Sequence, residues 1–179
     1  MPPPFRPLSQ AEFASELMSY PWHARIWRVD MHHTWFPAHA DYRGLASIEA
    51  MYRFHVHDLG WDDIAQHVSI APDGVIWTGR DWNKTPASVG GVLNRWAFMF
   101  ETIGNFDEGH DRLKGRQLES VVFVTRAVQK RFGLPPQALL FHRDVPVTAK
   151  TCPGTTVCKN DVVARVSQCD VGSVIQLRR

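Results

Sequence analysis

The sequence predicts an α/β fold, in which a mixed central β-sheet is flanked by α-helices within a single domain. Segments with the residue alternation of strands are separated by segments with the apolar spacing of helices. One turn, Pro72-Asp73-Gly74, joins two short strands as a hairpin. The length of 179 residues suits one domain with a full hydrophobic core.

Four segments have the spacing of apolar residues that is typical of helices. The clearest is 117–132, which ends before Gly133 and two prolines. The first helix is stopped by Pro21 and the second by Gly60. In chain order, the predicted helices cover residues 9–19, 47–59, 117–132 and 161–168.

Short apolar or alternating runs predict the strands. In the first, residues 25–33, alternate side chains point to opposite sides of the sheet. One face carries Trp27, Val29, Met31 and His33, and the other carries Ile26, Arg28, Asp30 and His32. Further strands are predicted on both sides of the turn within 65–79, at 96–101 and at 138–141.

Three polar residues, His32, Glu101 and His142, each stand where an apolar strand finishes. Ligand sites in α/β sheets lie beyond the carboxyl ends of the strands. We therefore expect these three side chains to converge.

Composition excludes several classes of function. The net charge of +2 gives no basic stripe for nucleic acid, so we expect no nucleic-acid partner. No apolar run approaches the roughly 20 residues that span a bilayer. The N-terminal residues lack the charged-then-apolar order of a signal peptide. We expect synthesis in the cytoplasm without a signal peptide, and no membrane insertion.

Two imidazoles and one thiolate, from His32, His142 and Cys152, would suit a zinc ion. Three protein ligands with water in the fourth position are typical of a catalytic rather than a structural zinc site. His142 and Cys152 share one irregular loop, whereas His32 comes from a distant strand. This arrangement differs from the close ligand pairs of a zinc finger.

Each candidate ligand also has a purely structural interpretation. A histidine at a strand end is often a packed imidazole, and an isolated cysteine is often a small core residue. His33 falls with the apolar face of its strand, so we favour His32 as the ligand. His55 and His57 are two positions apart on a predicted helix, so we interpret them as surface or packing residues.

Glu101 and Lys150 carry further chemistry. A carboxylate that closes an apolar strand is either a satisfied structural acid or a general base with a raised pKa. Lys150 is either solvated or placed to stabilise the oxyanion that forms when water attacks an amide.

The three cysteines, Cys152, Cys158 and Cys169, are an odd number, which argues against a disulfide framework. A Cys158–Cys169 pair stays open beside the interpretation that both are free thiols near a C-terminal helix.

Five motifs occur in order between about residues 25 and 157. They are MHHTW (31–35), LGWDDIAQH (59–67), PDGVIWTGR (72–80), MFETIGNFD (99–107) and HRDVPVTAKTCPG (142–154). Together they resemble the zinc-dependent N-acetylmuramoyl-L-alanine amidases of the type 2 amidase and peptidoglycan-recognition-protein superfamily.

The resemblance implies one zinc ion held by His32, His142 and Cys152, with Lys150 and Glu101 as catalytic residues. It implies hydrolysis of the amide between N-acetylmuramic acid and L-alanine in peptidoglycan or a muropeptide. Some phage members carry a catalytic Tyr where this chain has Gln66, so we expect Glu101 to take the acid–base role. Trp35, Arg80 and Asn83 are expected to form walls of the substrate groove.

On this basis residues 25–157 form the predicted zinc amidase domain. Residues 1–24 form an N-terminal extension with a short helix, and 158–179 a helix and tail packed on the same domain. Two alternatives remain open: a non-catalytic peptidoglycan-binding module, and a structural zinc site with Cys158 as fourth ligand. The ligand loop favours a bacteriolytic phage endolysin over a muropeptide-recycling enzyme or a delivered effector, and the endolysin or effector would act on the cell wall.

Overall fold

The computed structural model describes residues 4–146 and 149–168. A six-stranded sheet has the order β1-β4-β3-β5-β2-β6. Its parallel strands are β2 (Arg28–His33), β3 (Val68–Ile70), β5 (Ala97–Thr102) and β6 (Leu139–Phe141). Two antiparallel strands, β4 (Ile76–Thr78) and β1 (Pro7–Leu8), extend the edge beyond β3. The predicted mixed sheet in an α/β domain is confirmed.

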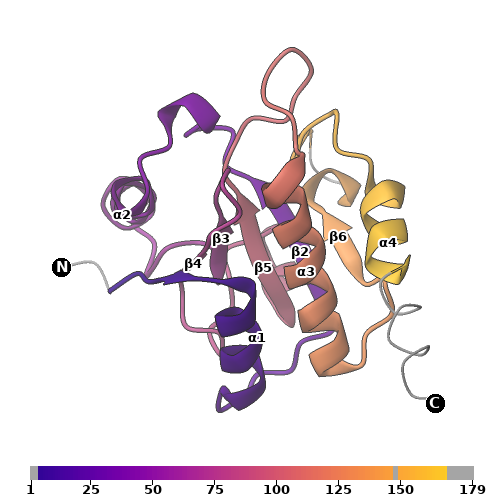
Figure 1. Cartoon of the computed structure of the whole chain (residues 1–179). Helices are drawn as coiled ribbons and strands as arrows, with labels where there is room; N and C mark the ends of the chain where they lie inside the picture. The colour runs from indigo at the N-terminus through magenta and orange to yellow at the C-terminus, as the bar shows by residue number, and fades with distance from the viewer. Residues whose placement is uncertain (1–3, 147–148, 169–179) are drawn as a thin grey trace.

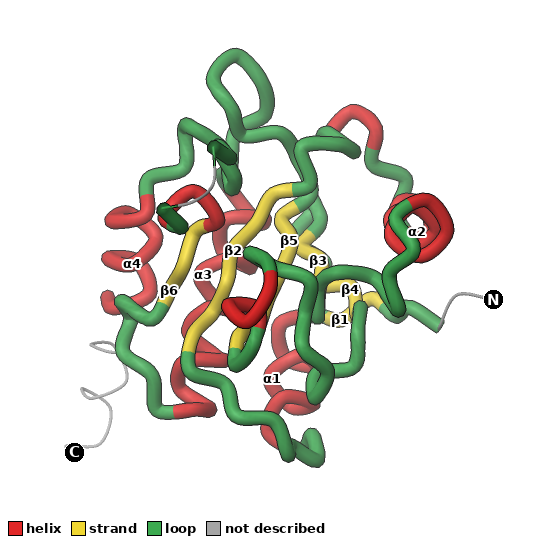
Figure 2. Tube along the Cα trace, turned by 180° about the vertical axis from the view of Figure 1, so that it is seen from behind, coloured by secondary structure: helices red, strands yellow, loops and turns green. Residues whose placement is uncertain are grey.

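The helices lie mainly on one side of the sheet. They are α1 (Gln10–Ser19), α2 (Leu45–Arg53), α3 (Gly115–Phe132) and α4 (Lys159–Gln168). Figure 1 shows α1, α3 and α4 in front of the strands and α2 beside them. In the view from behind, loops and short helical turns cover much of the opposite face (Figure 2). No helix in the described ranges is long and apolar enough to cross a membrane.

The predicted helix 47–59 differs from the structure in its second half. α2 begins at Leu45 and ends at Arg53, and Phe54–Asp58 then form a π-helical turn. This turn changes the direction of the side chains that follow Arg53. The first predicted strand is also shorter, since β2 begins at Arg28, and the exposed Trp27 before it stacks on Trp96 at 5.1 Å.

Strand alternation separates the hydrophobic core from a polar face. Val29 and Met31 of β2 and Phe98 and Phe100 of β5 are fully buried in the core cluster that includes residues of α3. The intervening positions, represented by Asp30, lie on the side away from these helices. Polar residues on two adjoining strands therefore share the face that loops cover.

Both ends of the described chain contribute to the same body. Phe13 and Leu17 of α1 are buried in the main core, together with Val162 and Val166 of α4. α1 begins at a capping box, in which Ser9 and Glu12 exchange hydrogen bonds of 3.2 and 2.7 Å. The predicted packing of the tail and the possible pairing of Cys169 concern positions outside the described residues.

Candidate metal and catalytic site

The structure brings His32, His142 and Cys152 together at the carboxyl end of the sheet. Their potential ligand atoms all lie within 4.8 Å of one another. His32 is the penultimate residue of β2, and His142 directly follows β6, its parallel neighbour. The two imidazole centroids are therefore only 4.9 Å apart.

This donor set fits zinc in its chemistry, and one of its distances is that of a tetrahedral site. Tetrahedral zinc, with bonds of about 2.0–2.3 Å, separates its ligand atoms by roughly 3.3–3.8 Å. Cys152 Sγ lies 3.4 Å from His32 Nδ1, inside that range. No other described group of three or more histidine, cysteine or acidic side chains has a metal-binding spacing.

Burial keeps these donors neutral in the absence of a cation. It lowers the pKa of His32 to about 3, with smaller contributions from His142 and His33. It also raises the pKa of the Cys152 thiol to about 12. A neutral imidazole offers a lone pair, and a bound cation would displace the thiol proton.

The neighbouring His33 points the other way, as its place in the alternation predicts. Its Nδ1 accepts a hydrogen bond of 3.2 Å from the Phe106 backbone N–H, and its ring packs on the Phe106 ring. Only its backbone reaches the donor set, where the N–H donates to Cys152 Sγ at 3.4 Å.

Glu101 occupies the position beside His32 in the sheet. The parallel register pairs His32 of β2 with Glu101 of β5, so both side chains emerge on the same face. Burial raises the pKa of the Glu101 carboxyl to about 8. A carboxyl with this pKa can hold or release a proton near neutral pH.

A cavity of about 500 Å³ opens above these groups. Lys150 and Trp35 line it together with Glu101 and the three candidate ligands. Trp35 is 62% exposed and has a φ of 59°, a strained conformation for a residue with a side chain. Its backbone N–H donates to the Gly104 carbonyl at 3.1 Å, which helps to hold this conformation.

The structure places Arg80 and Asn83 outside this cavity. The Arg80 guanidinium is buried outside the cavity and donates to the carbonyls of Ile64 and Thr85 at 2.8 and 2.6 Å. Asn83 likewise holds a neighbouring loop, since its side chain bonds to the backbone of three residues, Pro21, His23 and Ala24. A motif places such residues near a site without fixing the direction of their side chains.

His55 and Trp61 form a cavity wall that the sequence did not indicate. Their rings stack at 4.9 Å, and His55 Nδ1 accepts the Ala65 N–H at 3.2 Å. His55 belongs to the π-helical turn, so the spacing of a regular helix does not show that its ring reaches the cavity. The packing role expected for His55 is present, but the residue also faces the cavity.

Gln66 stands away from the cavity. Its buried side chain donates to Ser69 Oγ at 2.8 Å. A carboxamide does not exchange protons near neutral pH, so Gln66 lacks the chemistry of the tyrosine found there in some related enzymes.

Arg143 and Asp107 hold the ligand loop from two sides. The Arg143 N–H donates to the Cys152 carbonyl at 2.9 Å, and its guanidinium donates to the carbonyls of Gly154 and Val157. Asp107 accepts from Thr151 and Thr155 of the same loop at 3.0 and 2.9 Å. Sequence reasoning missed both residues, because their partners are mostly backbone groups.

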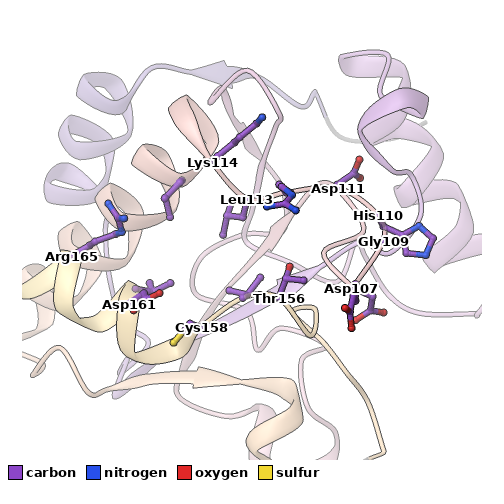
Figure 3. Close-up of a pocket in the computed structure, with 15 residues that line it drawn as sticks. Asp107, Gly109, His110, Asp111, Leu113, Lys114, Thr156, Cys158, Asp161 and Arg165 are labelled. Atoms are coloured by element: carbon purple, nitrogen blue, oxygen red, sulfur yellow. The ribbon is translucent and has the colours of Figure 1, made fainter.

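Cys158 does not join the donor set. It is exposed and lines a different cavity of about 670 Å³, whose wall also includes Asp161 and Arg165 (Figure 3). The alternative of a closed site with two histidines and two cysteines therefore has no support from the described residues.

Comparisons with known proteins place this chain in a family. The family model described as N-acetylmuramoyl-L-alanine amidase matches residues 22–155. Human N-acetylmuramoyl-L-alanine amidase is 30% identical over 127 residues, which are 69% of this chain and 22% of that protein. The chain thus spans about a fifth of the length of that relative.

Two solved structures illustrate the likeness in fold. The endolysin amidase LysCS from Clostridium intestinale is 24% identical, with a TM-score of 0.66 over 80% of this chain and 85% of that one. A point mutant of Drosophila PGRP-LB, solved in complex with tracheal cytotoxin, is 27% identical, with a TM-score of 0.61 over 74% and 78%. The chain therefore belongs to the N-acetylmuramoyl-L-alanine amidase family.

Proposed function

We propose that this protein is a zinc-dependent hydrolase that cleaves the amide between N-acetylmuramic acid and L-alanine in peptidoglycan or muropeptides. The observation that carries the proposal is the convergence of His32, His142 and Cys152 with Glu101 in one cavity. Family membership supports the choice of substrate. Three donors leave one position of a tetrahedral ion for water, as catalytic zinc sites do.

A zinc ion held by these donors would supply a Lewis acid and lower the pKa of water to near neutrality. The protein would then have to move a proton from that water to the leaving amine. Glu101 is the group for this step, because it lines the same cavity and its raised pKa favours proton exchange near pH 7.

Lys150 contributes positive charge to the cavity. Burial is the main cause of the lowered pKa of His142 and of the raised pKa of the Cys152 thiol, and the charge of Lys150 acts to lower both pKa values, which indicates that it lies near the donor set. In this setting an ammonium group stabilises the oxyanion that develops on the amide carbonyl. Trp35 and the His55–Trp61 stack offer apolar walls for the sugar or the peptide stem.

The biological role that we propose is cell-wall lysis of the endolysin type. The form of the ligand loop, with Lys150 two residues before Cys152 and Pro153-Gly154 after it, supports this choice. Loss of turbidity of permeabilised bacteria on addition of the protein would support it. Hydrolysis of soluble muropeptides alone, with intact walls unaffected, would replace it by muropeptide recycling.

The decisive experiment is mass spectrometry of purified peptidoglycan that has been incubated with the protein, with and without a zinc chelator. We expect stem peptides with a free N-terminal L-alanine, lost on chelation and restored by zinc. Cys152→Ala should lose both the metal and the products. Cys158→Ala is the matched control and should keep both, because this exposed thiol lies outside the donor set.

Two results would overturn the proposal. If metal-free protein cleaves peptidoglycan at the normal rate, the zinc assignment fails. If the zinc-loaded protein binds muropeptides and leaves them intact, the chain is a recognition module instead.

A further inference from the structure

A chain of hydrogen bonds runs from the cavity into the sheet behind His32. His32 Nε2 lies 2.8 Å from Ser88 Oγ, and this hydroxyl donates to Asp30 Oδ2 at 2.7 Å. Arg28 holds the same carboxylate with two bonds, of 2.7 Å from Nε to Oδ1 and 3.1 Å from Nη2 to Oδ2. The chain ends on a bidentate ion pair.

The strand supplies three of these groups because alternate residues share a face. Arg28, Asp30 and His32 occupy every second position of β2, so their side chains stand side by side on the helix-free face of the sheet. Asp30 is fully buried there, which is rare for a carboxylate and demands partners. The pair with Arg28 supplies the opposite charge that it needs.

The fourth group, Ser88, comes from a loop that is itself held in place. Asn94 Oδ1 accepts hydrogen bonds from the backbone N–H groups of Ser88 and Gly90, at 3.1 and 2.7 Å. The Arg28 guanidinium reaches the same loop and donates to the carbonyl of Leu93. The hydroxyl is therefore placed by the strand as well as by its own loop.

The directions of these hydrogen bonds follow from counting protons. A serine hydroxyl has one proton, and an ionised carboxylate can only accept, so Ser88 gives its proton to Asp30. Ser88 then meets His32 with a lone pair, and Nε2 must carry the proton of the neutral imidazole. The free lone pair is consequently on Nδ1, the nitrogen that lies 3.4 Å from Cys152 Sγ.

The other tautomer of His32 is disfavoured by the same groups. It would set the Nε2 lone pair against the Ser88 lone pair and leave a buried acceptor without a donor, which is destabilising. Since His32 is only 4% exposed, water offers little compensation.

From this geometry we propose that Ser88 and Asp30 are positioning residues, which hold His32 in the tautomer and ring orientation that present Nδ1 to a metal ion. The inference rests on the proposed zinc site and assigns a role to two residues outside the ligand set. Loss of a partner of this kind typically lowers metal affinity about 10–100-fold.

The first test is the zinc affinity of Ser88→Ala, measured by competition with a chromogenic chelator. We expect an affinity about 10–100-fold lower than that of the unmodified protein. Ser88→Thr retains the hydroxyl and should recover most of the loss. Ser120→Ala removes a hydroxyl that donates to the Gly74 carbonyl at 2.7 Å, far from the donor set, and should leave zinc affinity unchanged.

Asp30→Ala tests the direction of the chain. Without the carboxylate that accepts its proton, the Ser88 hydroxyl can donate to His32 Nε2 instead. The imidazole proton should then move to Nδ1, the ligand nitrogen. This change should lower zinc affinity more than Ser88→Ala does. Nitrogen NMR of the metal-free protein reads the tautomer directly, and circular dichroism checks that the variant is folded.

The outcomes separate this inference from the proposed function. If Ser88→Ala binds zinc normally and keeps the Nε2–H tautomer, while Cys152→Ala loses the metal, the positioning role fails and the zinc site stands. If Cys152→Ala also binds zinc normally, the ligand assignment itself fails.

Discussion

At the scale of single residues, Glu101 shows how a sheet prepares a carboxyl group for proton transfer. β5 places it beside His32, and partial burial limits its contact with the water that would stabilise its charge. The raised pKa follows from that location alone, because burial is its cause. A general base of this kind contributes typically 10²–10⁴-fold to turnover.

We therefore expect Glu101→Gln to lower kcat by about 100-fold or more, since a carboxamide has the shape of the acid without its proton exchange. Zinc content should stay at one ion per chain, because Glu101 is not among the three donors. Metal analysis and release of stem peptides measure the two quantities. Glu49→Gln, on the surface of α2, is the control and should change neither quantity. Near-normal turnover in Glu101→Gln would mean that another group is the general base.

At the scale of elements, the ligand loop depends on a close approach between two backbones. Gly154 has a φ of 112°, and a Cβ atom added there would lie 2.5 Å from the backbone carbon and oxygen of Phe106. Neither backbone can give way cheaply, because Phe106 also accepts hydrogen bonds from Thr156. The position of Cys152, two residues earlier, therefore depends on the absence of a side chain at Gly154.

Gly154→Ala should lower both the melting temperature and zinc affinity, because the loop must move away from Phe106 and carry Cys152 with it. Gly109→Ala is the matched control. It has a positive φ of 85° but open space around its Cβ position, so it should cost only about 1–2 kcal/mol of backbone strain. Equal zinc affinity in the two variants would show that the approach to Phe106 does not place the ligand.

The same element scale shows what the sequence can predict. Strands and long helices could be predicted because alternation and helical spacing directly reflect burial, as in β5 and α3. The strand β1 has two residues, too few for an alternating pattern. The π-helical turn was missed because it interrupts an otherwise regular amphipathic spacing.

The residues of the candidate site also differ in whether the sequence could predict them. His32, Glu101 and His142 could be predicted to converge because parallel strands end at one edge of the sheet. Ser88 could not, since a loop residue reaches His32 only through tertiary closure. The pattern of Arg28, Asp30 and His32 on one strand face was visible, but nothing in the sequence identified the residue that links Asp30 to His32.

At the scale of the whole molecule, buried histidines link stability to pH. Burial lowers the pKa of several of them, to about 3 for His32 and about 4 for His33, His55 and His67. His67 is fully enclosed: its Nε2 donates to the Lys84 carbonyl at 2.9 Å and its Nδ1 accepts the Met99 N–H at 3.0 Å. A proton can enter only by breaking the bond to Met99.

The metal-free protein should therefore lose stability as the pH falls from about 6.5 to about 4. In that pH range the unfolded chain binds protons that the buried histidines of the folded protein do not bind, so acid favours unfolding. For His67 alone, a lowering from 6.5 to about 4 corresponds to about 3 kcal/mol over the full window. Urea unfolding at a series of pH values measures the slope.

His67→Gln should reduce the dependence of the free energy of unfolding on pH. It should also lower stability at pH 7, because it removes an imidazole whose two nitrogens are both hydrogen-bonded. The free energy of unfolding of the unmodified protein should rise with pH through the window. A free energy of unfolding that stays constant between pH 4 and 6.5 would contradict the lowered pKa values of these histidines.

The separation of the donors along the chain has a consequence for biosynthesis. His32 and Cys152 are 120 positions apart, and the loop that carries Cys152 follows the last strand of the sheet. A ribosome adding about 5–20 residues per second would need about 6–24 s to pass from one to the other. For most of that time a nascent chain offers an ion only one imidazole of the set, so we expect zinc to load after the sheet has closed.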